Sequence, residues 1–224
     1  MKLSSNSRKF YAANILSIIT YLFEEDFVHR DLKLENFVMD GQGYLTLVDF
    51  GCAKRLPPGC MTNTMCGNPE YLAPEVVLSK GHFRAVDLWA FGVLLYEMVK
   101  GFTPFTPHDY HGNLTITYQN ILHSKDVLSK SDTFQSFDKV MAQVVKELLN
   151  ENPYMRMGML RDGIKEIWKH PFLVGYDQDK IFHRSLPAPY TIDNSDSIDS
   201  IFIYEDINIE EAPEYSGRFD FSSF

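Results

Sequence analysis

The sequence has few cysteines and no long apolar segment. Its 224 residues include only three cysteines, an odd number, and none forms a Cys-x-x-Cys pair. A disulfide framework or a zinc site is therefore not expected, and we predict a reducing cytoplasmic location, with the nucleus as an alternative. No apolar run approaches the roughly 20 residues that span a bilayer, so we expect no membrane span.

Positive charge is also scarce. Lysine and arginine total 21 against 30 aspartates and glutamates, which gives a formal net charge of −9. Proteins that bind nucleic acid usually present a basic face to the phosphates, so this balance argues against a nucleic-acid partner. Hydrophobic residues make up 45% of the chain, which is enough for a sizeable core.

The hydrophobic pattern predicts a mainly α fold of the α+β class. The stretch 49–80 is rich in Gly, Pro, Cys and Thr and indicates a long functional loop. We place a boundary near residue 174 and expect an irregular, exposed tail beyond it. We predict helices over 7–25, 84–100, 137–149 and 161–169, a hairpin of strands over 37–39 and 44–48, and at most one short helix, near 116–122, within 102–133.

Three short motifs follow one another in a meaningful order. His29-Arg30-Asp31 comes first, Asp49-Phe50-Gly51 follows a predicted strand, and Ala73-Pro74-Glu75 comes last. Taken alone, the second motif reads as an ordinary strand ending and Asp31 as a turn or capping residue. Together, with a hairpin between the first two, they match the catalytic-loop, metal-loop and activation-segment signatures of protein kinases.

The chemistry of phosphoryl transfer explains why these residue types are needed. The reaction depends on positioning and charge stabilisation, so a carboxylate must orient the substrate hydroxyl and accept its proton. Asp31 is the candidate base, and Lys33 lies two residues later, within reach of the transferred phosphate. Mg²⁺ prefers hard oxygen ligands, for which Asn36 and Asp49 are the candidates. The predicted cofactors are therefore ATP and Mg²⁺, bound through Lys33, Asn36 and Asp49.

The segment Thr62-Asn63-Thr64-Met65-Cys66-Gly67-Asn68-Pro69-Glu70-Tyr71-Leu72-Ala73-Pro74-Glu75 narrows the family. It resembles the activation segment of AGC-group serine/threonine kinases, and most closely that of the cAMP-dependent protein kinase catalytic subunit. The resemblance runs from about residue 8 to the C-terminus. It implies a kinase large lobe over residues 1–173 and an AGC-kinase C-terminal tail over 174–224.

The resemblance also implies partners and roles for individual residues. The expected partners are protein substrates with basic residues upstream of Ser or Thr, and a cAMP-binding regulatory subunit. Two of these roles have a plainer alternative. Glu35 and Glu97, which would bind substrate, could be ordinary solvated acids, and Thr64, the implied phosphorylation site, could be an unmodified loop residue. The implied roles are phosphorylation at Thr64 paired with Arg30 and Lys54, a buried ion pair of Glu75 with Arg156, a brace for the catalytic loop at Asp87, recognition of a substrate arginine by Glu35 and Glu97, and an apolar substrate pocket of Met65, Pro69 and Leu72.

The chain departs from the family pattern at several places. Asn68 replaces a threonine, Cys52 replaces a phenylalanine, and the stretch 106–117 is longer than its counterpart. A kinase small lobe also brings a Gly-rich loop and a strand lysine, and neither occurs before Asp31. We therefore expect the small lobe to be absent. Two functions follow: an active serine/threonine kinase, or an inactive truncated lobe that binds substrates or a regulatory subunit.

Overall fold

The computed structural model describes residues 3–107, 114–130 and 132–191. The chain divides into a compact unit, Met1–Thr191, and a second unit, Ile192–Phe224. Most of the expected C-terminal tail and part of the longer 106–117 stretch lie outside the described residues. The first unit is mainly helical with two small antiparallel strand pairs, which agrees with the predicted α+β class.

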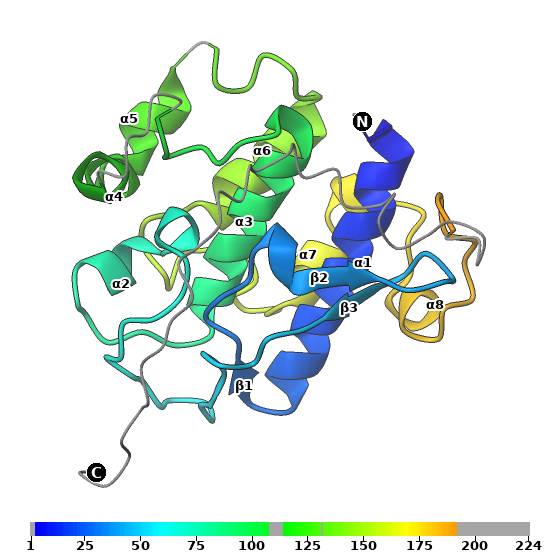
Figure 1. Ribbon diagram of the computed structural model, residues 1–224, viewed down its shortest axis with the longest axis horizontal. Helices are drawn as coiled ribbons and strands as arrows, with labels where there is room; N and C mark the ends of the chain where they lie inside the picture. The colour runs from blue at the N-terminus through cyan, green and yellow to red at the C-terminus, as the bar shows by residue number, and fades with distance from the viewer. Residues whose placement is uncertain (1–2, 108–113, 131, 192–224) are drawn as a thin grey trace, which may run out of the picture. The chain divides into compact units, whose positions relative to one another are not determined.

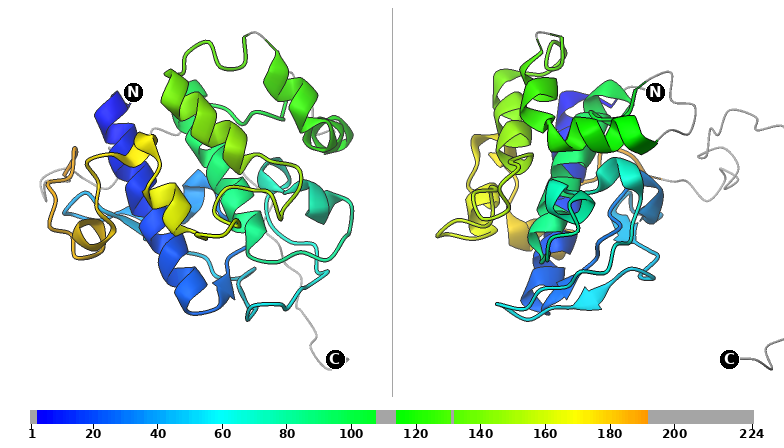
Figure 2. Two further views of the ribbon diagram at one scale, coloured as in Figure 1. Left: turned by 180° about the vertical axis from the view of Figure 1, so that it is seen from behind. Right: turned by 90° about the vertical axis from the view of Figure 1, so that its left-hand side faces the viewer.

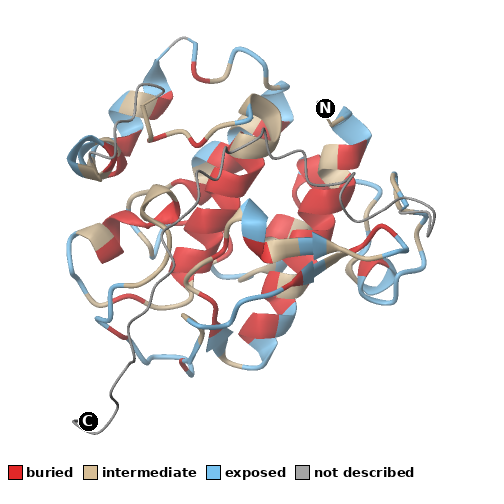
Figure 3. Cartoon of the chain, viewed as in Figure 1, coloured by how far each residue is buried: buried red, intermediate tan, exposed pale blue. Residues whose placement is uncertain are grey.

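Two long helices form the centre of the first unit (Figure 1). Helix α1 (Ser5–Glu24) begins where the Ser4 hydroxyl accepts a hydrogen bond from the N–H of Ser7 at 3.1 Å. Helix α3 (Ala85–Lys100) ends at Gly101, which takes the left-handed conformation with φ of 81°. All residues of α3 from Ala85 to Tyr96 are buried, and Figure 3 shows the buried residues concentrated along α1 and α3.

Helix α6 (Lys139–Leu148) packs against α3, as the left view of Figure 2 shows. Its buried residues Met141, Val144, Val145 and Leu148 recur at helical spacing and form one apolar stripe. Asp138 caps its N-terminus by accepting a hydrogen bond from the N–H of Met141 at 2.8 Å. The predicted helices near 7–25, 84–100 and 137–149 are confirmed.

The predicted hairpin is also confirmed. Strand β2 (Phe37–Met39) pairs antiparallel with β3 (Leu45–Leu47), with Phe37 opposite Leu47. The turn is closed by Asp40, whose carboxylate accepts from the N–H groups of residues 42 and 44. A second pair joins β1 (Phe27–Val28) to β4 (Lys54–Arg55). The residues after β1 lie close to those after β3, since the ring centroids of His29 and Phe50 are 5.1 Å apart and Arg30 donates a hydrogen bond to the carbonyl of Cys52.

The stretch 102–133 differs from its prediction, because its described residues form two helices rather than at most one. These are α4 (Leu114–Leu122) and α5 (Ser124–Ser129). The N-terminus of α5 is stabilised by the carboxylate of Glu151, which accepts from the Ser124 hydroxyl at 2.9 Å and from the N–H of Lys125 at 3.1 Å. This acid lies far along the chain, so the local pattern gave no sign of it.

Shorter elements complete the first unit. The predicted loop 49–80 is irregular except for β4, the 3₁₀ turn η2 (Pro69–Tyr71) and the short helix α2 (Pro74–Val77). Helix α7 (Lys165–Trp168) is shorter than the predicted 161–169. Further 3₁₀ turns are η1 (Leu34–Asn36) and η3 (Pro171–Leu173).

The prediction of an irregular, exposed chain beyond residue 175 is wrong in one respect for residues 176–191: they include a helix, although most of them are exposed, as predicted. Helix α8 (Gln178–Phe182) packs against α1. The following residues are fastened to the β2–β3 hairpin, since the Tyr44 hydroxyl donates to the carbonyl of Leu186 at 2.7 Å and Arg184 pairs with Asp40 at 2.6 Å. The compact unit therefore extends to Thr191, while the domain boundary near 174 and the absence of a small lobe stay predictions.

None of the helices among residues 3–107, 114–130 and 132–191 combines the length and hydropathy that crossing a membrane requires.

Candidate active site

The loop that carries the first motif is held by one buried carboxylate. Asp87, in the first turn of α3, is fully buried and accepts hydrogen bonds from the backbone N–H groups of His29 and Arg30, both at 2.8 Å. Burial raises the pKa of Asp87 to about 6, although the two N–H donors oppose that rise. Arg30 takes a positive φ of 68°, which this support makes tolerable in a residue with a Cβ.

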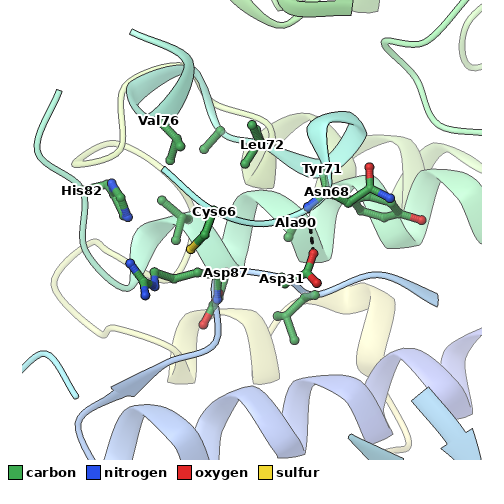
Figure 4. A pocket seen from close by; sticks show the side chains of 13 residues that line it. Asp31, Cys66, Asn68, Tyr71, Leu72, Val76, His82, Asp87 and Ala90 are labelled. Carbon is green, nitrogen blue, oxygen red and sulfur yellow. Dashed lines mark hydrogen bonds between the residues drawn. The ribbon is translucent and has the colours of Figure 1, made fainter. Parts of the chain in front are cut away.

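Three groups converge on the carboxylate of Asp31. The backbone N–H of Asn68 donates to its Oδ1 at 2.8 Å, the contact drawn as a dashed line in Figure 4. The ammonium of Lys33 lies 3.3 Å from its Oδ2. The Asn36 amide nitrogen donates to the Asp31 carbonyl at 2.9 Å and approaches Oδ2 at 3.4 Å. The carboxylate is thus held in one orientation while its side chain keeps 12% exposure.

Asn36 and Asp49 are brought together by the backbone. The N–H of Val48 donates to the carbonyl of Asn36 at 2.9 Å, which places the residue after Val48 beside the end of η1. Asp49 itself has a φ of 60°, and its Oδ1 accepts from the N–H of Gly51 at 3.1 Å. A positive φ at a non-glycine residue marks a position under local constraint, which is common in functional sites.

The donor set of these two side chains fits magnesium. The Asn36 nitrogen is turned toward Asp31, which leaves its amide oxygen as the atom that can face a cation. An amide oxygen and a carboxylate are the hard ligands that Mg²⁺ takes, with water and phosphate completing its shell. No cluster of three or more His, Cys, Asp and Glu suited to a metal occurs among the described residues.

Arg30 connects the catalytic loop to the activation segment. Its Nε donates to the carbonyl of Cys52 at 2.7 Å, and its Nη1 approaches the carbonyl of Thr64 at 3.4 Å. Lys54 donates to the hydroxyl of Thr62 at 3.0 Å. The side chain of Thr64 is exposed. Of the two basic residues predicted to accompany it, Arg30 contacts the Thr64 backbone, whereas Lys54 contacts Thr62, two residues earlier.

Glutamates gather beside the C-terminal half of α3. The Tyr71 hydroxyl donates to Oε2 of Glu97 at 2.5 Å, and Thr103 donates to Glu70 at 2.8 Å. Burial raises the pKa of Glu97 to about 7; the Tyr71 hydrogen bond opposes this rise, and the charges of Glu35 and Glu70 add to it. Sequence reasoning found Glu35 and Glu97 but missed Tyr71 and Glu70, for which only proximity to the Ala73-Pro74-Glu75 motif was a signal.

The predicted ion pair of Glu75 and Arg156 is formed. Both side chains are buried, and the two guanidinium nitrogens of Arg156 donate to the two carboxylate oxygens of Glu75 at 2.8 and 3.0 Å. Arg156 also donates to the carbonyls of Ala85 and Asn150, and its guanidinium lies 5.2 Å from the ring centroid of Trp89. This network anchors the end of the activation segment to the first turn of α3.

The three residues of the predicted apolar substrate pocket differ in exposure. Leu72 is buried and lines a small internal cavity, Pro69 is half-buried at the start of η2, and the side chain of Met65 is 50% exposed. The Asn68 side chain accepts from the N–H of Glu70 at 3.0 Å, so Asn68 reaches Asp31 through its backbone rather than its amide.

Comparison with known proteins places this site in a family. A family model described as the protein kinase domain matches residues 1–173. The chain is 40% identical over 191 residues to cGMP-dependent protein kinase 2 of Rattus norvegicus, covering 85% of this chain and 24% of the relative. It is 36% identical over 219 residues to the cAMP-dependent protein kinase catalytic subunit PRKX of Mus musculus, covering 97% and 59%.

A third relative, the cAMP-dependent protein kinase catalytic subunit of Dictyostelium discoideum, is 34% identical over 222 residues, covering 98% of this chain and 33% of the relative. The chain thus spans between about a quarter and three-fifths of the length of these curated relatives. The family match covers most of the chain and includes all three motifs, so the chain belongs to the protein kinase domain family.

Proposed function

We propose that this chain carries the phosphoryl-transfer machinery of a serine/threonine protein kinase. The observation that supports this most directly is the environment of Asp31. Its carboxylate is oriented by the N–H of Asn68 and the amide of Asn36, with the ammonium of Lys33 3.3 Å away. A fixed carboxylate beside a fixed cation suits a base that takes the proton of a hydroxyl while a phosphoryl group approaches.

We assign the metal and the nucleotide to the same place in the compact unit as Asp31. Asn36 and Asp49 would hold Mg²⁺ through their oxygen atoms, and Lys33 would contact the transferred phosphate of ATP. Bound Mg²⁺ neutralises the charge of the phosphates and orients them for in-line transfer. The contribution of this chain is to fix Asn36 and Asp49 in adjacent positions through the Val48 N–H bond, before any ligand is present.

Substrate preference follows from the glutamates beside α3. Glu35, Glu70 and Glu97 lie close enough that the first two raise the pKa of the third, and Glu35 is exposed. A guanidinium from a protein substrate would relieve the repulsion among these acids and form charge-assisted hydrogen bonds. We therefore propose protein substrates with arginine upstream of the acceptor Ser or Thr, consistent with the basic substrates that the family resemblance implies.

The test is a transfer assay on the 224-residue chain. Purified protein is incubated with Mg-ATP and a peptide of the form Arg-Arg-x-Ser, and phosphate incorporation is followed by mass spectrometry. The Asp31→Ala variant is expected to lose about 10²–10⁴-fold in rate, since a general base contributes that much. Peptide binding should be retained, because the substitution leaves the three glutamates proposed to hold the arginine unchanged. Transfer at the same rate in this variant would refute the assignment of the base.

A second candidate is a non-catalytic module that binds substrates, and the same experiment separates it from the first. The glutamate group is complete in this chain whether or not transfer occurs. Fluorescence anisotropy of a labelled peptide, with an Arg→Ala peptide as the matched control, measures binding alone. Arginine-dependent binding without any transfer would favour the binding module and exclude an active kinase for this chain.

A further inference from the structure

A cavity of about 240 Å³ lies between the activation segment and the start of α3. Its walls come from the segment 56–61 and from Phe83, Arg84, Tyr154 and Met159, none of which is assigned above to catalysis or substrate recognition. Among the described residues that line it, none is acidic and Arg84 alone is charged. The cavity is smaller than the roughly 300–1,000 Å³ of most ligand pockets, so it suits a small ligand.

The activation-segment wall of the cavity is a closed turn. The N–H of Cys60 donates to the carbonyl three residues earlier at 2.9 Å, and between them Pro58 is followed by Gly59 with φ of 85°. Proline followed by a glycine at positive φ is typical of a type II turn. Just beyond this wall, Thr62 exchanges two backbone hydrogen bonds of 2.9 Å with His82. The wall is therefore held in place without a ligand.

Two aromatic rings supply apolar surface to the cavity. The ring centroids of Phe83 and Tyr154 are 5.3 Å apart, with 33° between the ring planes. Tyr154 is 61% exposed and Met61 is 49% exposed, so both keep surface that the described chain does not cover. Rings favour offset-stacked or edge-to-face aromatic partners, and a thioether adapts its shape to them. These side chains are therefore suited to contact a flat apolar ligand.

Arg84 gives the cavity its positive charge. None of the ion pairs that the described residues form includes Arg84, and its guanidinium lies 5.5 Å from the ring centroid of Phe23. The residue is half-buried, so part of its surface is already withdrawn from water. A guanidinium binds a carboxylate through two parallel N–H bonds, which are charge-assisted and stronger than neutral hydrogen bonds. The cavity is therefore complementary to an anion.

A neighbouring cavity shows the opposite balance of charge. It measures about 470 Å³ and shares Met61 and both aromatic rings with the first. Its lining includes the carboxylates Glu75 and Glu151, whereas Lys80 is the only cation among the described residues that line it. An anion that reaches the aromatic rings is therefore favoured in the cavity that Arg84 lines.

We propose that the cavity lined by Arg84 is a binding site for a small aromatic carboxylate, whose ring lies against Tyr154 and Phe83 and whose carboxylate pairs with Arg84. Such a ligand satisfies the apolar wall and the single cation together. An uncharged arene would leave the guanidinium without a partner, and a carboxylate without a ring would leave the aromatic surface uncovered. Because the ligand would contact the turn at Pro58 and Gly59, its binding would restrain the activation segment just before Thr62.

The test measures binding and does not need transferase activity. The probe is 2-naphthoate, and 2-naphthamide, which has nearly the same shape without the charge, is its matched control. Calorimetric titration of the 224-residue protein should give a Kd of about 1 mM or below for the naphthoate. The naphthamide should bind about tenfold more weakly or worse, because it loses the charge-assisted bonds. Hydrogen–deuterium exchange should slow in peptides that cover residues 57–62 when naphthoate is bound.

Variants assign the binding to the named side chains. Arg84→Gln should weaken naphthoate binding about tenfold and leave naphthamide binding unchanged. Arg55→Gln is the matched control, because it removes the same charge from an exposed arginine that does not line the cavity, and it should have no effect. Tyr154→Ala should weaken naphthoate binding severalfold, whereas Tyr154→Phe keeps the ring and should restore it. Tyr154 is largely exposed, so these two variants keep the test valid if Arg84→Gln does not fold.

Several results would overturn the proposal. They are equal binding of naphthoate and naphthamide, equal loss in Arg84→Gln and Arg55→Gln, and no saturable binding of naphthoate. Tighter binding of an acidic aromatic peptide, acetyl-Asp-Phe-Asp-amide, would assign the cavity to a protein partner and also overturn it. Naphthoate binding that depends on Arg84 in a protein without transferase activity would uphold this site and refute only the proposed function.

Discussion

Replacing Glu97 with glutamine tests the electrostatics of the glutamate group. The Glu97 carboxylate accepts a hydrogen bond from the Tyr71 hydroxyl at 2.5 Å, and glutamine can still accept this bond through its amide oxygen. What the substitution removes is a partly buried negative charge beside Glu35 and Glu70. The change therefore isolates the cost of ionising Glu97 in the folded protein, with little change of shape.

The magnitude follows from the pKa. Burial raises the pKa of Glu97 from its ordinary 4.5 to about 7 in the folded state. The folded protein therefore holds a proton that the unfolded chain releases between pH 4.5 and 7, and stability falls as pH rises through that window. A difference of about 2.5 pKa units corresponds to about 3 kcal/mol. Glu97→Gln should match the parent protein near pH 4 and exceed it by up to about 3 kcal/mol at pH 8.

Urea unfolding of both proteins at several pH values provides the assay. The difference between them cancels the titration of other groups, including Asp87, whose pKa of about 6 lies in the same window. Glu35→Gln is the matched control, because that side chain is exposed and its replacement should change stability only through its repulsion of Glu97, by much less than Glu97→Gln at pH 8. A difference between Glu97→Gln and the parent that stays constant with pH, or that favours the parent above pH 7, would refute the reasoning. Arginine-peptide binding, if Glu97 contributes to it, should weaken below pH 7.

Three further substitutions probe the framework of the site. Arg156→Met leaves Glu75 buried without its partner and should lower the free energy of unfolding in urea by about 3–5 kcal/mol. Adding Glu75→Gln should recover part of that loss. Full stability of the single variant would contradict the buried pair. Gly43→Ala should lower the free energy of unfolding by about 1–3 kcal/mol, because φ is 84° and the new Cβ would collide with the backbone carbonyl of Tyr190. Gly41→Ala, with open space around it, is the control and should be nearly neutral. Equal effects of the two substitutions would refute that packing. Asp138→Ala should lower the free energy of unfolding by about 1 kcal/mol through loss of the α6 cap, and an unchanged thermal midpoint would show that this cap contributes nothing.

Some of the expectations remain open after the fold is known. Four expectations stay predictions: the regulatory subunit, the cellular location, phosphorylation of Thr64 and the absence of a small lobe. None of them concerns the fold of the described residues. The roles assigned to Asp31, Asn36 and Asp49 are proposals that rest on their placement.

The sequence by itself determined the elements whose signals are local. The periodicity of 7–25 and 84–100, the Asp-Gly turn after residue 39 and the three motifs depend on neighbouring residues, so pattern reading found them along with the catalytic candidates. It also indicated the family, because short motifs in a fixed order carry the chemistry of phosphoryl transfer.

Only the tertiary structure decided how distant segments meet. Glu151 stabilises the start of α5, Tyr71 holds Glu97, and the chain beyond residue 175 folds back onto the hairpin turn at Asp40. Each of these contacts joins residues far apart in the sequence. Packing and hydrogen bonding in the folded chain determine which residues are partners, and local periodicity and propensity carry no information about such distant contacts.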